Sequence, residues 1–308
     1  MEITASMVKQ LREMTGAGVM ACKKALVETD GDFDKAIEVL REKGEATAVK
    51  KAGRIATEGT VLAVVEGNKA AIVEVNSETD FVAKNEKFRS FVSNIANQVL
   101  ASDAKSVEEL SDEKFINDNA KTVKEELISQ IAVIGENMSI RRFEKIVTDG
   151  VVVPYIHGGG RIGVLVEATG ANNDDAKEAL RNIAMQIAAL NPKYTSDSEV
   201  DPEFLAHEKE ILLAQIKNDP KEANKPEKVI NGMIEGRMKK ELKEICLLDQ
   251  VYVKAEDGKQ SVAAYLAEVS KATGSSIAIT KFVRFETGEG LEKKSENFAE
   301  EVAKQMGQ

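Results

Sequence analysis

The sequence has few of the residues from which enzymes commonly build catalytic and metal sites. Its 308 residues include two histidines, two cysteines and no tryptophan. No CxxC or HExxH motif occurs, and neither does a GxxxxGKS or GxxxxGKT phosphate loop, so zinc hydrolysis and nucleotide hydrolysis lack their usual residues. We therefore expect a protein that is not an enzyme and that uses no metal ion and no cofactor.

Long apolar runs are also missing. The longest apolar stretches, such as residues 61–65, are far shorter than the about 18 residues that a membrane-spanning helix needs. The first 14 residues lack the continuous apolar stretch and the small-residue cleavage site of a secretory signal. We therefore expect no membrane contact and a cytoplasmic location, where Cys22 and Cys246 remain thiols.

The charge of the chain is acidic. It has 52 Asp and Glu against 42 Lys and Arg, a formal net charge of −10. An acidic surface repels the phosphate backbone, so we expect no direct binding of nucleic acid. The length favours two domains as a starting expectation.

Apolar residues recur at helical spacing near the N-terminus. Residues 4–14, 19–29 and 30–44 each carry one apolar stripe, which only packing against the other segments can bury. They predict a compact three-helix module. Residues 41–60 contain three glycines and a lysine-rich middle, and they predict a linker that is partly helical.

From residue 60 the apolar period becomes strand-like. The segments TVLAVV and AAIVEVN, separated by EGNK, predict a β-hairpin over 60–76, and a helix is expected to begin near Asn85. Residues 107–134 are expected to be helical. Strand patterns return at Met138, and a further helix is expected over 173–190. Antiparallel strands and helices in one core indicate the α+β class.

Two parts of this core resemble each other. Residues 93–102 (SNIANQVLAS) align with 181–190 (RNIAMQIAAL) with five identities in ten, and the preceding strands align through Glu74 and Glu167. The offset is 93 for the strands and 88 for the helices, so the first copy holds five extra residues, around 77–85. The pattern predicts an internal duplication with an additional loop in the first copy.

Residues 203–247 predict a charged helical hairpin. Two amphipathic segments are joined by NDPKEANKPEK, in which Pro220 and Pro226 interrupt the helical pattern. We expect the two helices to fold back as an antiparallel coiled coil that projects from the core. Beyond it we expect a helix near 261–270, a strand at AITKFVRFE and a terminal amphipathic helix from Phe298 to Met306.

The segment HGGGRIG matches the GxGxxG pattern, but in the wrong context. In a dinucleotide-binding fold the pattern opens a helix, whereas here the strand-like VLVEA follows. We interpret it as a glycine-rich β-turn. His157, which precedes the turn, is open to two interpretations: a hydrogen-bonded structural histidine at a strand end, or a functional residue.

Longer segments carry a more specific signal. They are ITASMVKQLREMTGAGVMACKKAL (3–26), VNSETDFVAKN (75–85), IGENMSIRRF (134–143), HGGGRIGVLV (157–166), EGRMKK (235–240) and FVRFETGEGLEK (282–293). In this order they resemble the signature segments of the translation elongation factor Ts family, whose members exchange the nucleotide of elongation factor Tu. The resemblance spans essentially the whole chain.

The resemblance implies an architecture of five parts. They are a three-helix domain of the ubiquitin-associated type with its linker, a first core subdomain, an interrupted second core subdomain, the coiled-coil insertion and a C-terminal module. Their expected limits are 1–55, 56–150, 151–201 with 245–285, 202–244 and 286–308.

The resemblance also implies an exchange loop formed by Thr79, Asp80, Phe81 and Val82. In the family the Phe is inserted between helices of the partner's G domain, and the Asp disturbs the magnesium site. Without the resemblance, the favoured interpretation of Asp80 and Phe81 is a helix-capping Asp and a core Phe at a strand-to-helix corner. The motif match and the five extra residues of the first copy reverse that preference.

Further partner contacts are implied for both halves of the chain. The matching residues are Arg12, Met20, Lys23, Ile134, Gly135 and His157. Met20 has an alternative interpretation as a filler of the three-helix core, and Val19 stands where some members carry a second Met. The hairpin and the terminal helix are implied as additional contacts.

The implied function is binding of elongation factor Tu, in its GDP-bound and nucleotide-free forms, with displacement of GDP through its Mg²⁺ and phosphate site. A protein that binds the nucleotide-free form more tightly lowers GDP affinity by the same factor, without catalytic chemistry. The alternative function is a noncatalytic helical adaptor that binds another protein through the three-helix domain, with the loop at 79–82 merely structural.

Overall fold

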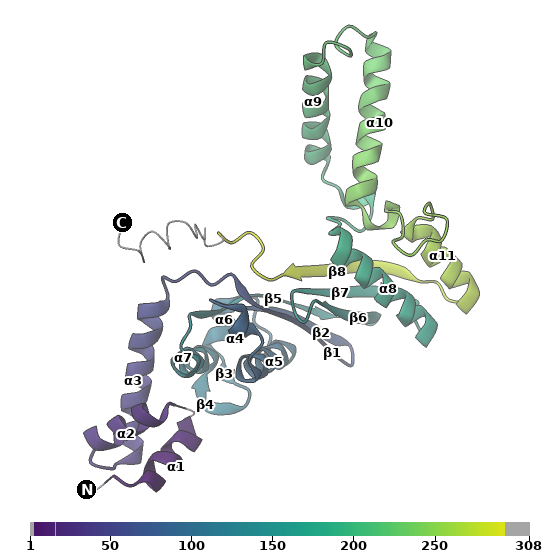
Figure 1. Cartoon of the computed structure of the whole chain (residues 1–308). Coiled ribbons are helices and arrows are strands. Elements are labelled where there is room, and N and C mark those ends of the chain that lie inside the picture. The colour runs from purple at the N-terminus through teal and green to yellow at the C-terminus, as the bar shows by residue number, and fades with distance from the viewer. Residues whose placement is uncertain (1–2, 16, 293–308) are drawn as a thin grey trace.

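The computed structural model describes residues 3–15 and 17–292 (Figure 1). N-terminal helices lead into a body built on two three-stranded antiparallel sheets, from which a pair of long helices extends. The mixture of helices and antiparallel sheets confirms the α+β class. Within the described residues, no helix combines the length and the apolar character needed to cross a membrane.

The N-terminal module contains the three helices that the sequence predicted. They are α1 (Ala5–Thr15), α2 (Val19–Glu28) and α3 (Phe33–Lys51). Their apolar stripes meet in a small core around Leu11, Cys22 and Leu26. Asp32 starts α3, because its carboxylate accepts a hydrogen bond from the Lys35 amide at 3.1 Å.

The first sheet has the strand order β1-β2-β5. Its strands are β1 (Glu58–Glu66), β2 (Lys69–Ser77) and β5 (Met138–Val147). Between β2 and β5 the chain forms α4 (Asp80–Ala83), α5 (Glu86–Ala101), α6 (Val107–Asp112), β3 (Lys114–Phe115), β4 (Asp118–Thr122) and α7 (Val123–Ile134). Helices α5 and α7 cover one face of the sheet and share its core. The predicted hairpin and the predicted helix start at Asn85 are both confirmed.

The two-stranded ribbon of β3 and β4 corrects the expectation that residues 107–134 are helical throughout. The side chain of Gln98, in α5, donates to the Lys114 carbonyl at 3.2 Å and accepts from the Ile116 amide at 2.7 Å. Within β4, the Asp118 side chain accepts a hydrogen bond from the Ala120 amide. These bonds satisfy backbone groups that a helix would have paired internally.

The second sheet has the strand order β6-β7-β8. Its strands are β6 (Val151–His157), β7 (Ile162–Thr169) and β8 (Ala278–Glu286). The remaining elements of this half are α8 (Asp174–Leu190), the 3-10 helices η1 (Asp197–Glu199) and η2 (Leu247–Asp249), and α11 (Val262–Thr273). Helix α8 packs on one face of this sheet, and α11 packs against α8. The glycine-rich segment is the turn between β6 and β7, which confirms its interpretation as a β-turn.

A helical hairpin extends from the second half of the body (Figure 1). It consists of α9 (Pro202–Asn218) and α10 (Glu227–Ile245). Leu212, Ile216, Ile234 and Met238 form a small core of its own. The predicted projecting hairpin is therefore present, while its description as a coiled coil stays a prediction.

The two sheets are related in the way that the alignment predicted. In each, a hairpin is followed by a helix and then by a third strand that pairs antiparallel with the second. The pairing with the third strand shifts register immediately after Glu74 in one sheet and after Glu167 in the other. These are the two residues that the sequence alignment equates.

The helices after the hairpins share a further detail. Gln98 in α5 and Gln186 in α8, which are aligned in the sequence, are both buried. Each side-chain amide donates to one backbone carbonyl and accepts from the amide two residues later, within residues 114–116 for Gln98 and 251–253 for Gln186. The same pair of bonds at equivalent positions supports the internal duplication.

The two sheets pack on each other through a shared apolar core that includes Val61, Ile72, Leu165 and Phe285. Side chains alternate along a strand, so Glu74 lies on the same face of β2 as Ile72 and is fully buried between the sheets. An unpaired carboxylate there would be very unfavourable. It therefore needs hydrogen-bond donors from both halves of the body.

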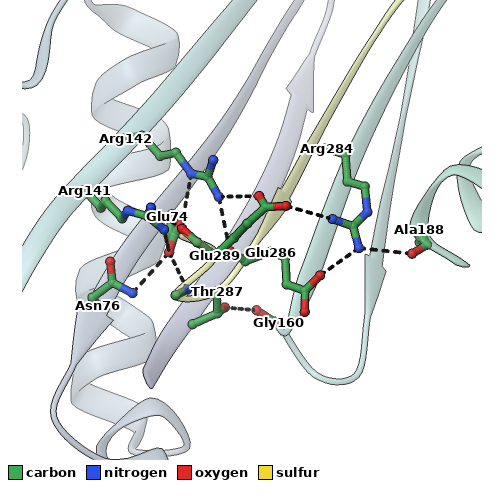
Figure 2. Close-up of polar contacts among 11 residues, drawn as sticks. Glu74, Asn76, Arg141, Arg142, Gly160, Ala188, Arg284, Glu286, Thr287 and Glu289 are labelled. Atoms are coloured by element: carbon green, nitrogen blue, oxygen red, sulfur yellow. Dashed lines mark hydrogen bonds and ion pairs between the residues drawn. The ribbon is translucent and has the colours of Figure 1, made fainter. Parts of the chain in front are cut away.

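Figure 2 shows these donors around Glu74. Its oxygens accept hydrogen bonds from Arg141 at 2.9 Å and from Arg142 at 2.5 Å, both on β5. They also accept from the Asn76 side chain at 3.1 Å and from the Gly288 amide, just beyond β8, at 2.8 Å. One carboxylate thus ties the first sheet to the end of the last strand of the second sheet.

Helix α3 is longer than predicted, because it continues through much of the expected linker to Lys51. Gly44 is buried where α3 meets α7, and a Cβ at this position would lie 3.6 Å from that of Ala132. At the end of α3, the Lys51 ammonium donates to the Gly135 carbonyl. Packing on α7 stabilises the second half of α3, and a glycine-containing pattern in the sequence gives no sign of it.

The cysteine expectation agrees with the structure, since Cys22 and Cys246 are both free and buried. The terminal helix expected from Phe298 to Met306 lies outside the described residues, as does most of the C-terminal module. The division into five parts at the stated limits stays a prediction.

Candidate functional site

The segment of residues 79–82 opens α4, a single helical turn between β2 and α5. Thr79 is the N-cap, and its hydroxyl oxygen accepts a hydrogen bond from the Val82 amide at 3.4 Å. Ala83 is 8% exposed and faces the core, whereas Phe81 is 82% exposed. Because residues two apart lie on roughly opposite sides of a helix, the turn that buries Ala83 presents Phe81 to solvent.

The exposure of Phe81 excludes one of the interpretations made from the sequence. Phe81 is more exposed than any other large apolar side chain in the described part of the chain. The interpretation as a core Phe is therefore wrong. The capping interpretation of Asp80 is also wrong, because Thr79 is the cap and Asp80 is the first residue of the helix.

Asp80 adds a negative charge beside this apolar ring. Lys84, four residues later, donates a hydrogen bond to the Asp80 carboxylate at 2.6 Å. This hydrogen bond lowers the pKa of Asp80 below its ordinary value. An Asp is ionised at neutral pH with or without this shift, so the pairing with Lys84 places a positive charge beside a carboxylate that remains half-exposed.

Ile134 and Gly135 lie next to the loop at the end of α7. Gly135 ends this helix in the left-handed conformation, with φ of 87°, and is exposed. Ile134 is half-buried against the first core. The following residue, Glu136, accepts hydrogen bonds from both the amide and the hydroxyl of Thr79. The structure thus brings the segment at 134–136 and the loop together.

The glycine turn between β6 and β7 reaches the same region from the other sheet. Thr60 and Arg89 donate to the Ala83 carbonyl at the end of α4, at 3.4 and 3.2 Å. Gly160 lies against Thr60 so closely that an added Cβ would be 2.7 Å from the Thr60 methyl carbon. The absence of a side chain at Gly160 therefore lets the turn pack beside the residues that hold α4.

His157 is the last residue of β6 and is exposed. The Tyr155 hydroxyl lies 3.1 Å from its Nδ1 atom. An exposed ring with this partner is compatible with both interpretations made from the sequence. Its role in binding a partner stays a prediction.

Arg12, Met20 and Lys23 lie in the N-terminal module and are all exposed. Met20 is 63% exposed, so the interpretation as a filler of the three-helix core is wrong. Arg12 and Lys23 line one shallow hollow with Val19. This surface of α1 and α2 is at the opposite end of α3 from its connection to β1 (Figure 1). The predicted site residues therefore form two separate surfaces.

Three residues of the loop region were not predicted from the sequence as site residues. They are Lys84, Arg89 and Glu136. The i,i+4 spacing of Asp80 and Lys84 is a signal that could have identified their pairing. Glu136 is distant in sequence from Thr79, and only the pairing of β2 with β5 brings the two together. In the described part of the chain, no group of three or more His, Cys, Asp or Glu side chains could hold a metal ion.

Comparison with known proteins gives a consistent result. The family model described as "Elongation factor TS" matches residues 78–289. "Elongation factor Ts" of Clostridium novyi is 56% identical over 310 aligned residues, which cover 99% of both chains. Proteins of the same name from Clostridium perfringens and Clostridioides difficile are 56% and 52% identical, again over 99% of both chains.

Proposed function

The chain belongs to the elongation factor Ts family, and on that premise we propose that residues 79–82 act on the nucleotide site of elongation factor Tu. As a member of this family, the protein is a guanine nucleotide exchange factor for elongation factor Tu in translation elongation. Exchange requires no bond to be made or broken in this protein.

The first step is a thermodynamic linkage. Elongation factor Tu is bound in its GDP form and in its nucleotide-free form, and the nucleotide-free form is bound more tightly. By linkage, the ratio of these two affinities equals the factor by which GDP binding is weakened. Any contact that forms only when the nucleotide site is distorted contributes to that factor.

Phe81 is the contact that best fits this requirement. Its ring is exposed in the free protein, so inserting it between helices of the partner's G domain removes apolar surface from water. Burial of a Phe side chain is favourable by about 1.5 to 3 kcal/mol, which corresponds to roughly a 10- to 150-fold change in an equilibrium constant. The single observation that carries the proposal is this exposure, 82% on a one-turn helix whose other side is buried.

Asp80 acts beside it through its charge. Mg²⁺ requires near-ideal octahedral coordination by oxygen and is sensitive to displaced ligands and waters. A carboxylate brought close to the Mg²⁺ site competes for that network and weakens the hold on GDP. In the free protein, the hydrogen bond from Lys84 holds the Asp80 carboxylate beside the Phe81 ring.

The second surface holds the partner while the loop acts. Arg12, Met20 and Lys23 bind the G domain from a module of the ubiquitin-associated type, and Ile134, Gly135 and His157 add contacts beside the loop. A second, tethered contact raises the effective concentration of the loop at its target. The hairpin of α9 and α10, as a coiled coil, and the C-terminal module extend the contact.

Release of GDP tests this function directly. Elongation factor Tu is loaded with fluorescent GDP and chased with unlabelled GDP, with and without the purified protein. We expect release to accelerate with protein concentration and to reach a plateau. A helical adaptor that used only its three-helix module would bind a partner and leave the release rate unchanged.

A further inference from the structure

The two strands that flank the exchange loop stop pairing at its base. Ser77 and Met138 are the last partners in the ladder of β2 with β5. Beyond them, side chains replace the backbone ladder. Glu78 accepts a hydrogen bond from the Asn137 amide at 2.6 Å. In the other direction, Glu136 accepts one from the Thr79 amide at 3.0 Å.

Glu136 makes a second bond that controls the cap of α4. The Thr79 hydroxyl donates to a Glu136 carboxylate oxygen at 2.6 Å. A hydroxyl has one hydrogen, so this bond leaves only lone pairs to face the Val82 amide, 3.4 Å away. The carboxylate therefore fixes both the position of Thr79 and the direction in which its oxygen accepts.

Helix α4 depends on this cap more than an ordinary helix does. It has four residues, and a helix this short has few internal hydrogen bonds to stabilise it. The Phe81 ring, 82% exposed, contributes little packing in the free protein. The direction in which Phe81 and Asp80 point is consequently set by the backbone of the turn and by the groups that hold it.

Glu136 lies between the end of a helix and a buried strand residue. Gly135 before it terminates α7, and Met138 after it is buried in the first core. We propose that Glu136 is a positioning residue for nucleotide exchange. It orients Thr79 and thereby sets the conformation of the exchange loop. The inference rests on the proposed function of residues 79–82, and it assigns Glu136 no contact with elongation factor Tu.

A positioning role for Glu136 affects the saturating rate of GDP release much more than the half-saturating protein concentration. Loss of Glu136 leaves the N-terminal surface and the rest of the loop region able to bind, so the half-saturating protein concentration should change by less than about threefold. Without Glu136, Phe81 and Asp80 no longer point in the direction that the exchange step requires. Small misplacements of an acting group cost one to two orders of magnitude in rate, so the saturating rate of GDP release should fall about tenfold or more.

The experiment measures GDP release against protein concentration for wild type, Glu136→Ala, Thr79→Val and the double variant. Because Glu136 acts through Thr79, the double variant should release GDP no more slowly than the slower single variant. Hydrogen exchange of the Val82 amide in the free protein should be faster in Glu136→Ala than in wild type. Glu66→Ala, which removes an exposed glutamate at the far end of β1, is the matched control and should change neither quantity.

Three results would overturn the inference. They are an unchanged saturating rate in Glu136→Ala, a loss confined to the half-saturating concentration, or additive losses in the double variant. If Glu136→Ala unfolds, Glu136→Gln serves instead, because it keeps the size and loses one of the two acceptors. Failure of the proposed function is distinguishable, since it would appear as a Phe81→Ala variant that releases GDP at the wild-type rate.

Discussion

Asp80 and Lys84 form an ion pair across the single turn of α4, with Lys84 Nζ 2.6 Å from a carboxylate oxygen of Asp80. The pair joins the first residue of the turn to the residue that follows it. It holds a charge beside the exposed Phe81 ring and lowers the pKa of Asp80. The charge nearest to the Phe81 ring is therefore paired locally, between α4 and the residue that follows it.

Removing Lys84 should raise the pKa of Asp80 towards the ordinary value of about 3.9. The stabilisation from a lowered Asp pKa is present above the unfolded-state pKa and is lost as the pH falls through the folded-state pKa. In Lys84→Ala, a change in stability should accordingly depend on pH only below about pH 5. NMR titration of the Asp80 side-chain carboxyl measures the shift, and an unchanged pKa in the variant would contradict the assigned cause.

The buried Glu74 should be important for stability. Glu74→Ala leaves Arg141 and Arg142 without their shared carboxylate between the two sheets, and breaking a buried ion pair costs about 3 to 5 kcal/mol. Urea unfolding measures the loss. The control is Glu144→Ala, which breaks an exposed pair with Lys281 and should cost less than about 1 kcal/mol. Equal effects of the two substitutions would show that the Glu74 cluster has no special role.

Replacing residues 202–244 by a short flexible linker should leave a folded body. The hairpin buries its own apolar residues, and the bridge between Tyr194 and Cys246 at its base lies outside the deletion. Thermal and urea unfolding should remain cooperative, while affinity for elongation factor Tu should fall. Loss of the cooperative transition would mean that the hairpin is integral to the second half of the body.

Gly44 lies at the contact of α3 with α7, so a substitution there tests how tightly the two helices pack. A Cβ at Gly44 would lie 3.6 and 3.7 Å from side-chain carbons of Ala132 and Ile128, which are ordinary van der Waals contacts. Gly44→Ala should therefore stabilise the protein by about 0.5 to 1 kcal/mol through its helix propensity. Gly232→Ala, in the open helix α10, is the matched control. A destabilised Gly44→Ala variant would mean that the two helices are packed too tightly to admit a methyl group.

The sequence predicted most strands and helices of the body, because alternating and helical apolar patterns directly reflect the buried faces. In the structure, the register shifts of both sheets fall immediately after Glu74 and Glu167, the residues that the alignment equated. The sequence did not predict the ribbon of β3 and β4, whose backbone is held by Gln98 from a different element. It also ended α3 too early, because the stabilising contact is with a helix some 80 residues away in sequence.

The candidate site was predictable only in part. Motif resemblance identified Phe81, but the pattern of one helical turn is too short to tell an exposed Phe from a buried one. Exposure depends on where Thr79 starts the helix and on Ala83 facing the core. Glu136 could not be assigned from sequence, since its carboxylate meets Thr79 across 57 residues at the end of a strand pair.

The most direct test of the account compares wild type, Phe81→Ala and Val147→Ala in the GDP-release assay at saturating protein. Val147 is also apolar and exposed, but it lies at the far end of β5 from the loop. Phe81→Ala should lower the saturating rate about tenfold or more, because each 1.4 kcal/mol of lost contact is a factor of ten. Its unfolding free energy should stay within about 1 kcal/mol of wild type, whereas truncation of a core Phe costs about 3 to 5 kcal/mol. Val147→Ala should match wild type in the release rate. A Phe81→Ala variant that releases GDP as fast as wild type would contradict the account.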